Sequence, residues 1–309
     1  MVLKEFPDLQ WLKKQAETRF SNQRDAAGKK LPNAGWPNVI LNATSNNTYR
    51  DNIRGPLSIF TNLSGKSMIE AGSKRVIVND GFLFVTNQDQ HYTLQIDKVK
   101  TETFNIHFGE YFAEQVMHSI SHDAGKLIDD EFQVPHAHLE LYNKIHQKDQ
   151  VIDTLIQGLR EVESDKLKEE EKLYQLMIKL LRKNNIIKKN EKEIPVIKNS
   201  TREEIQKRMN AATDYIYSFY EREISLAELA KAACLSKFHF LRLFKIAYQT
   251  TPHQFITSVK INRAKILLKH QKHDVNVIAK NLGFANSSSF SRSFYNHVKM
   301  YPSQYRAIV

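Results

Sequence analysis

Hydrophobic positions change their spacing along the chain, and each spacing predicts a different kind of structure. Between residues 57 and 108, short runs rich in β-branched and aromatic residues are separated by Gly, Asn and Asp, which is typical of strands joined by turns. The expected strands cover 57–63, 75–79, 81–86, 91–96 and 104–108, and a helix over about 110–122 follows. Five strands with no long helical pattern between them predict a small antiparallel barrel or sandwich.

The middle of the chain, from residue 137 to about 190, has the spacing of helices. Apolar residues recur there at intervals of three, four and seven, so they share one helix face, while Glu and Lys occupy the remainder. Such a stripe must be buried, either within the same chain or against a second copy. We predict a dimer seam, with packing inside one chain as the alternative; its residues are Leu173, Leu176, Met177 and Leu180. The charged stretch 184–200, broken by Pro195, predicts a linker.

The last third of the chain contains an internal repeat. Residues 225–235 align with 274–284, and after one inserted residue 240–244 align with 290–294. Each copy predicts a short helix, a tight turn and a second helix that buries two phenylalanines, which is the pattern of a helix-turn-helix. A helix over 252–269 joins the copies and is about 27 Å long. Two second helices held this far apart could enter successive major grooves, which are about 34 Å apart.

The charge of the chain is concentrated in this repeat. The 309 residues include 45 Lys and Arg against 34 Asp and Glu, a net charge of +11. Residues 225–309 hold 13 basic and 2 acidic residues and so carry the whole excess, which leaves residues 1–224 neutral. A basic block of this kind favours a polyanion, and the spacing of its helices predicts duplex DNA.

Composition excludes several other classes of protein. A hydrophobic content of 41% and a charged content of 26% are typical of a globular chain rather than a disordered one. The single cysteine, Cys234, excludes a disulfide framework within the chain and favours a reducing cytoplasm. No apolar run is long enough to span a bilayer, so we expect no membrane partner.

The outward side of each predicted second helix holds the candidate DNA-binding residues. They are Ser236, Lys237, Phe238, His239, Leu241, Arg242 and Lys245 in the first copy, and Asn286, Ser287, Ser288, Ser289 and Arg292 in the second. The alternatives are solvated surface for the two arginines, helix capping for the serines, and a core position for Phe238. Equivalent positions of Arg242 and Arg292 within a basic block favour contacts in a DNA groove.

The motifs of the repeat resemble those of the AraC/XylS family of transcription regulators. The resemblance spans Thr201 to Arg306 and rests on the segments 235–245, 278–284, 289–294 and 301–306. It implies a bacterial, sequence-specific DNA-binding regulator in which Phe238, Leu241, Arg242, Ser287, Ser288 and Arg292 face base edges. Leu241 departs from the polar residue that is frequent in the family, so a thymine methyl group is the contact expected there.

The resemblance also implies a multi-domain α+β architecture. Residues 1–136 would form a cupin-like β-barrel with a regulatory role and His91 in its pocket, after an N-terminal extension for which no structure is predicted. Residues 137–200 would form the helical dimerisation section and linker, and residues 201–309 the all-α double helix-turn-helix. The implied partners are double-stranded promoter DNA, a small-molecule effector, a second copy in a homodimer, and RNA polymerase.

Two other interpretations of the N-terminal domain stay open. It could serve only to oligomerise or to bind a protein partner, or it could be a metal-dependent cupin enzyme with a DNA-binding appendage. The candidate metal ligands are Glu114, His118, His122, His136 and His138. The predicted strands themselves offer only His91 and His107, and no nucleophile or phosphate loop accompanies them, so we expect no metal, no cofactor and no catalytic residue.

Overall fold

The computed structural model describes residues 2–11, 14, 37–121, 139–141, 143–161, 165–191, 199–270 and 273–308. The chain forms two compact units, Met1–Ile186 and Ile187–Val309. Among the helices of the described residues, none is both long and apolar enough to cross a membrane.

The first unit is built on an eight-stranded sheet. Its strands are β1 (Val2–Leu3), β2 (Val39–Arg54), β3 (Ser58–Ser64), β4 (Lys66–Ala71), β5 (Lys74–Asn79), β6 (Phe82–Thr86), β7 (His91–His107) and β8 (Ile145–Gln147). They follow the order β1-β2-β7-β3-β6-β8, and β4 pairs with β5 and β7. The β1–β2 pair is parallel and the other pairs are antiparallel, so the sheet is mixed. Among the described strands no pairing joins β1 to β8, so the sheet does not close there.

Five strands differ from the sequence prediction. Four of them, β1, the 16-residue β2, the short β4 and β8, were not predicted, and β8 lies in the stretch expected to be helical. The fifth, β7, is one 17-residue strand where two separate strands were expected. The middle of β7, Asp97 to Lys100, is exposed and polar apart from Val99, and Lys98 has a positive φ of 60°, which is typical of a loop. Pairing with β2 nevertheless holds both ends of β7 in one strand.

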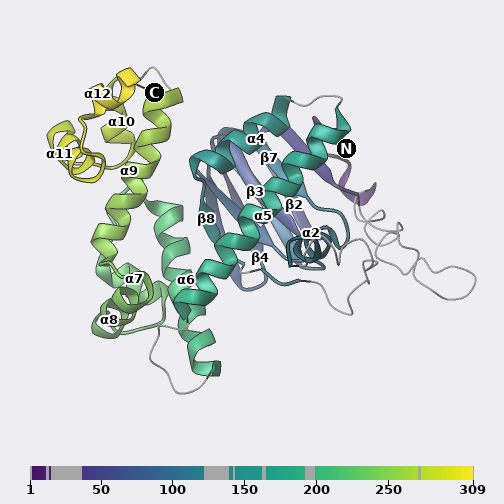
Figure 1. The fold of residues 1–309 in the computed structure, drawn as a ribbon, viewed down its shortest axis with the longest axis horizontal. Coiled ribbons are helices and arrows are strands. Elements are labelled where there is room, and N and C mark those ends of the chain that lie inside the picture. The colour runs from purple at the N-terminus through teal and green to yellow at the C-terminus, as the bar shows by residue number, and fades with distance from the viewer. Residues whose placement is uncertain are drawn as a thin grey trace, which may run out of the picture. The chain divides into compact units, whose positions relative to one another are not determined.

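Helices cover one face of this sheet (Figure 1). They are α2 (Phe112–Ser121), α4 (Gln150–Glu161) and α5 (Lys166–Glu191). The predicted dimer-seam residues of α5, namely Leu173, Leu176, Met177 and Leu180, are each 0% exposed. They lie in one core with Ile59 and Ile106 of the sheet. The prediction that this stripe forms a dimer seam is therefore wrong, because its side chains have no surface left for a second copy.

The second unit is helical. It consists of α6 (Asn199–Phe219), α7 (Leu226–Ala232), α8 (Lys237–Tyr248), α9 (Pro252–His270), α10 (Val275–Asn281), α11 (Ser287–Val298) and α12 (Pro302–Ile308). The predicted repeat is visible as two helix pairs, α7–α8 and α10–α11, joined by α9 (Figure 1). Each of the four paired helices has a polar N-cap that accepts a backbone hydrogen bond, and the caps are Ser225, Ser236, Asp274 and Asn286.

Candidate functional site

The second helix of each pair buries the same two positions. Phe240 and Phe244 of α8 are 0% exposed, as are Phe290 and Phe294 of α11. Phe244 contacts the ring of Phe255 with centroids 5.5 Å apart, and Phe294 contacts Tyr305 at the same 5.5 Å. Equivalent aromatic contacts therefore fix both helices in the same rotation about their axes, and so determine which residues face outward.

The outward face of α8 carries most of the first set of candidate residues. Lys237, His239, Arg242 and Lys245 are all exposed. Phe238 is 85% exposed, which rules out the core position that its sequence allowed. Leu241 is also partly exposed on this face. An exposed phenylalanine beside basic residues can contact base edges or thymine methyl groups, while the lysines can neutralise phosphates.

The outward face of α11 is less basic and mostly hydroxylated. Ser288 and Arg292 are exposed, and Ser287 and Ser289 are partly buried. The side chain of Asn286 accepts from the Ser289 amide at 2.8 Å, and the Ser289 hydroxyl donates back to the Asn286 carbonyl at 2.8 Å. Asn286 and Ser289 thus cap the helix, which leaves Ser287, Ser288 and Arg292 with side chains that no cap engages.

Both turns between paired helices have the same hydrogen-bonded form. Leu235 N–H donates to Ala230 at 2.9 Å in the first turn, and Phe284 N–H donates to Ala279 at 3.0 Å in the second. The residue before each donor adopts the left-handed conformation, with φ of 51° at Cys234 and 67° at Gly283. Only the second position is glycine, because a Cβ at Gly283 would meet the backbone of Glu221.

Gly283 lies directly against the backbone of the loop that follows α6. A Cβ at Gly283 would collide with the carbonyl oxygen of Glu221 and come within 2.7 Å of its carbonyl carbon. The pair α10–α11 therefore packs closely against the loop after α6 at Gly283. Nearby, Lys260 of α9 donates to the Gly283 carbonyl at 2.9 Å and lies 5.2 Å from the ring centroid of Phe284. Burial lowers the pKa of this lysine.

The first helix pair is held by a corresponding basic side chain and by a carboxylate network. Arg208 of α6 donates to the Cys234 carbonyl at 2.7 Å. Glu228 of α7 accepts from Arg222 at 2.7 Å, from Tyr215 at 2.9 Å and from the Ser225 amide at 2.8 Å. These hydrogen bonds, that of Arg222 foremost, lower the pKa of Glu228 to about 2. The carboxylate is therefore charged at neutral pH and fixes α7 against the end of α6.

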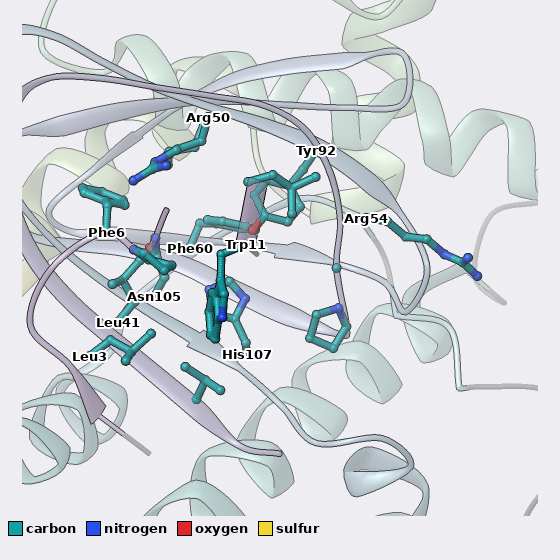
Figure 2. A pocket seen from close by; sticks show the side chains of 16 residues that line it. Leu3, Phe6, Trp11, Leu41, Arg50, Arg54, Phe60, Tyr92, Asn105 and His107 are labelled. Atoms are coloured by element: carbon teal, nitrogen blue, oxygen red, sulfur yellow. The ribbon is translucent and has the colours of Figure 1, made fainter. Parts of the chain in front are cut away.

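The first unit contains a pocket on the sheet face opposite the helices. Because strand residues alternate between faces, Val39, Leu41 and His107 point to this side while Ile40 and Ile106 point to the helix-covered core. The N-terminal segment from Leu3 to Trp11 lies across the pocket, contributing Leu3, Phe6, Pro7 and Trp11 to its lining (Figure 2). The cavity has a volume of about 60 Å³ and is open to solvent on one side.

The histidine of this pocket is His107 and not the expected His91. His91 is exposed, and its Nδ1 lies 2.8 Å from Asn52 Oδ1. His107 is buried, with its Nδ1 2.9 Å from the Ser58 hydroxyl, and burial lowers its pKa to about 4. Both side chains belong to β7, and sequence alone does not show which end of the strand lies beneath the N-terminal segment.

The described residues contain no cluster of three or more potential metal ligands. Of the candidate ligands, His122, His136 and His138 lie outside the described residues. Glu114 accepts a hydrogen bond from the Leu139 amide at 2.6 Å.

The match to a known family lies in the second unit. Residues 229–308 match a family model described as a helix-turn-helix domain. A probable transcriptional regulator, LumQ of Photobacterium leiognathi, is 32% identical over 31% of this chain and 39% of its own length. The melibiose operon regulatory protein of Escherichia coli K12 is 29% identical over 36% of this chain and 37% of its own length. The chain thus spans less than two fifths of the length of these curated relatives.

Among solved structures, a similar chain is a transcriptional regulator from Chromobacterium violaceum described as an AraC-type DNA-binding domain-containing protein. It is 26% identical, covers 33% of this chain and 91% of its own, and has a TM-score of 0.32. The C-terminal part of this chain is an AraC-type helix-turn-helix domain.

Proposed function

We propose that the chain is a transcription regulator that binds promoter DNA through α8 and α11. The observation that supports this most strongly is the repeated geometry of the two helices. Each is capped, anchored by the same pair of buried phenylalanines, and presents an arginine, Arg242 or Arg292, at the equivalent outward position. The helix α9 between the pairs is 19 residues long, about 28 Å, which suits two entries into one face of a duplex.

In this proposal, affinity comes mainly from basic side chains that displace counterions from phosphates. Each phosphate contact contributes about 0.9 to the slope of log affinity against log salt. The predicted DNA-binding residues divide accordingly. Lys237 and Lys245 contact phosphates, whereas Phe238, Leu241, Arg242, Ser287, Ser288 and Arg292 choose the sequence, with Ser236, His239, Asn286 and Ser289 at the edges of the interface.

The test is the salt dependence of full-length protein bound to a duplex selected from a random pool. Replacing Lys237 and Lys245 together by Ala should reduce the slope by about 2. The matched control replaces Lys166 and Lys168, exposed lysines of the first unit, and should leave the slope unchanged. Equal slopes in all three proteins, or no saturable binding of the wild type at low salt, would reject the assignment.

We further propose that the first unit receives a small-molecule effector. The pocket beneath the N-terminal segment supports this over a domain that only oligomerises, because a sheet serving only as an interface needs no space inside it. Binding there would favour one state of the regulator over another. In this scheme residues 1–136 act as the cupin-like regulatory part, 137–200 as the helical section and linker, and 201–309 as the DNA-binding part.

Other partners follow from the same scheme. A regulator of promoter DNA acts in the cytoplasm, and RNA polymerase is its expected downstream partner. Homodimerisation stays a prediction, now without the α5 stripe as its surface. The regulator needs no catalytic step, and no metal or cofactor enters the proposal.

A further inference from the structure

The pocket of the first unit is lined by a tyrosine whose hydroxyl group has no hydrogen-bond partner among the described residues. Tyr92 of β7 is 6% exposed, and its hydroxyl forms no hydrogen bond to any described residue. Figure 2 shows this side chain directed into the pocket from its upper wall. Because no described residue engages this hydroxyl, Tyr92 has a donor available for whatever enters the pocket.

His107 offers a complementary but uncharged group. The Ser58 hydroxyl donates to the Pro56 carbonyl at 2.8 Å, so its single hydrogen is already used. The Nδ1 of His107, 2.9 Å from the same oxygen, must therefore be the donor in that contact. The neutral ring then presents Nε2 as an acceptor, for which the described residues provide no donor. His107 adds no charge to the pocket.

Two arginines line the pocket, and they differ in their partners. Arg54 is paired with Asp89 at 3.2 Å, and in Figure 2 its side chain extends away from the other lining residues. The guanidinium carbon of Arg50 instead lies 5.3 Å from the ring centroid of Phe6, and among the described residues no carboxylate lies within ion-pair distance of it. Its positive charge also acts on Tyr92, whose pKa it lowers against the larger opposing effect of burial. Arg50 and Tyr92 both line the pocket, and Figure 2 shows both at its upper side.

A change of strand register places Arg50 there. In a regular strand, residues an even number of positions apart face the same side. Val39, Leu41 and Arg50 of β2 all line the pocket, although Arg50 is an odd number of positions from the other two. The pairing of β2 with β7 is irregular between Ser45 and Asn47, where one residue of β2 lies opposite three of β7, and beyond this bulge the side chains that face the pocket change in parity. The chain thus brings a cation to a mostly apolar surface.

We propose that this pocket binds a small apolar carboxylic acid. The carboxylate pairs with Arg50 and accepts a hydrogen bond from the Tyr92 hydroxyl. The apolar body lies among the rings of Phe6, Trp11 and Phe60, which line the same pocket. A sugar is disfavoured, because its many hydroxyl groups would meet apolar side chains over most of this surface. The inference rests on the proposed effector role of the first unit and names the ligand class of that site.

The test uses Trp11 as an internal reporter. The chain has two tryptophans, Trp11 and Trp36, so a Trp36→Phe background leaves the pocket residue as the sole indole. Octanoate and 3-phenylpropanoate are titrated against the full-length protein, each beside its neutral amide. At least one acid should change Trp11 fluorescence saturably and bind at least 10-fold more tightly than its amide.

Variants separate the charge from the rest of the pocket. Arg50→Gln should weaken binding of the acid about 10- to 100-fold and leave the amide unchanged, as expected for loss of a charge-assisted hydrogen bond. Tyr92→Phe should weaken the acid about 10-fold. The matched control, Arg54→Gln, should change the affinity less than about 3-fold because this arginine already has a partner. Circular dichroism on each variant verifies that it is folded.

The outcomes that reject the proposal are distinct from those that reject DNA binding. Absence of saturable binding by both acids, equal binding of acid and amide, or equal effects of the two arginine variants would each overturn the ligand class. Because the titration contains no DNA, a negative result here leaves the salt-dependence test of DNA binding unaffected.

Discussion

Replacing Gly283 by Ala should destabilise the second unit more than its small size suggests. Gly283 has φ of 67°, a conformation that costs an L-residue about 1 to 2 kcal/mol. The added Cβ also collides with the backbone of Glu221, which cannot move away as a flexible side chain could. Forced shifts of this kind cost about 1 to 3 kcal/mol. We therefore expect a total loss of about 2 to 5 kcal/mol, a large part of the stability of a typical domain.

The repeat supplies a matched control for this substitution. Cys234 occupies the equivalent turn with φ of 51° and already carries a Cβ, and it is exposed. Cys234→Ala creates the same residue in the same conformation but removes only a sulfur atom, so we expect a change below about 0.5 kcal/mol.

The assay is urea unfolding of the full-length protein followed by circular dichroism at 222 nm, which the helices of the second unit dominate. Gly283→Ala should lower the midpoint of that transition, and Cys234→Ala should leave it in place. Equal midpoints for Gly283→Ala and the wild type would refute the close approach of Gly283 to Glu221.

Three further predictions concern the core, the pH response and the autonomy of the units. Leu176→Ala should lower the free energy of unfolding in urea by about 2 to 5 kcal/mol and leave the mass measured by light scattering unchanged. A stable variant of half the mass would instead support the α5 stripe as a dimer interface. Unfolding stability should fall as pH drops from 6.5 towards 4, because His107 stays neutral in the folded chain while the unfolded chain binds a proton; its pKa values of 6.5 and about 4 correspond to about 3 kcal/mol. His107→Asn should remove part of this dependence of stability on pH. Buried His146, whose pKa burial also lowers, contributes the remainder in the same direction. An unchanged pH dependence in the variant would contradict a neutral, buried His107. Residues 187–309 expressed alone should bind duplex DNA at low salt, and a folded fragment that fails to bind would contradict the proposed interface.

The repeat could be predicted from the sequence because the chain contains its own comparison. Phe240 and Phe290 recur with the same neighbours, so the buried face of one copy determines that of the other and the outward residues follow. The partner of a buried stripe cannot be deduced in this way. Leu176 and Leu180 have the same spacing whether they pack on a sheet or on a second copy, and only the fold shows that the sheet covers them.

The pocket could not be predicted because its position depends on long-range pairing. Arg50 belongs to a strand whose polar sequence gave no strand signal, and an irregularity in the pairing of that strand with β7 determines the face on which it lies. Tyr92 and His107 lie at opposite ends of β7, which the sequence divides into two strands at its polar middle. Only the pairing of β7 with β2 brings these three side chains to one surface.

The central claim is that α8 and α11 read separate segments of one duplex, and base preference measures this directly. Full-length wild-type, Arg242→Ala and Arg292→Ala proteins are each used to select sites from a randomised duplex pool. We predict that each variant loses preference at its own few base pairs, that the two sets lie about 10 base pairs apart, and that each loss costs about 1 to 3 kcal/mol on the wild-type site. Loss of affinity without loss of preference, or loss at the same base pairs in both variants, would contradict it.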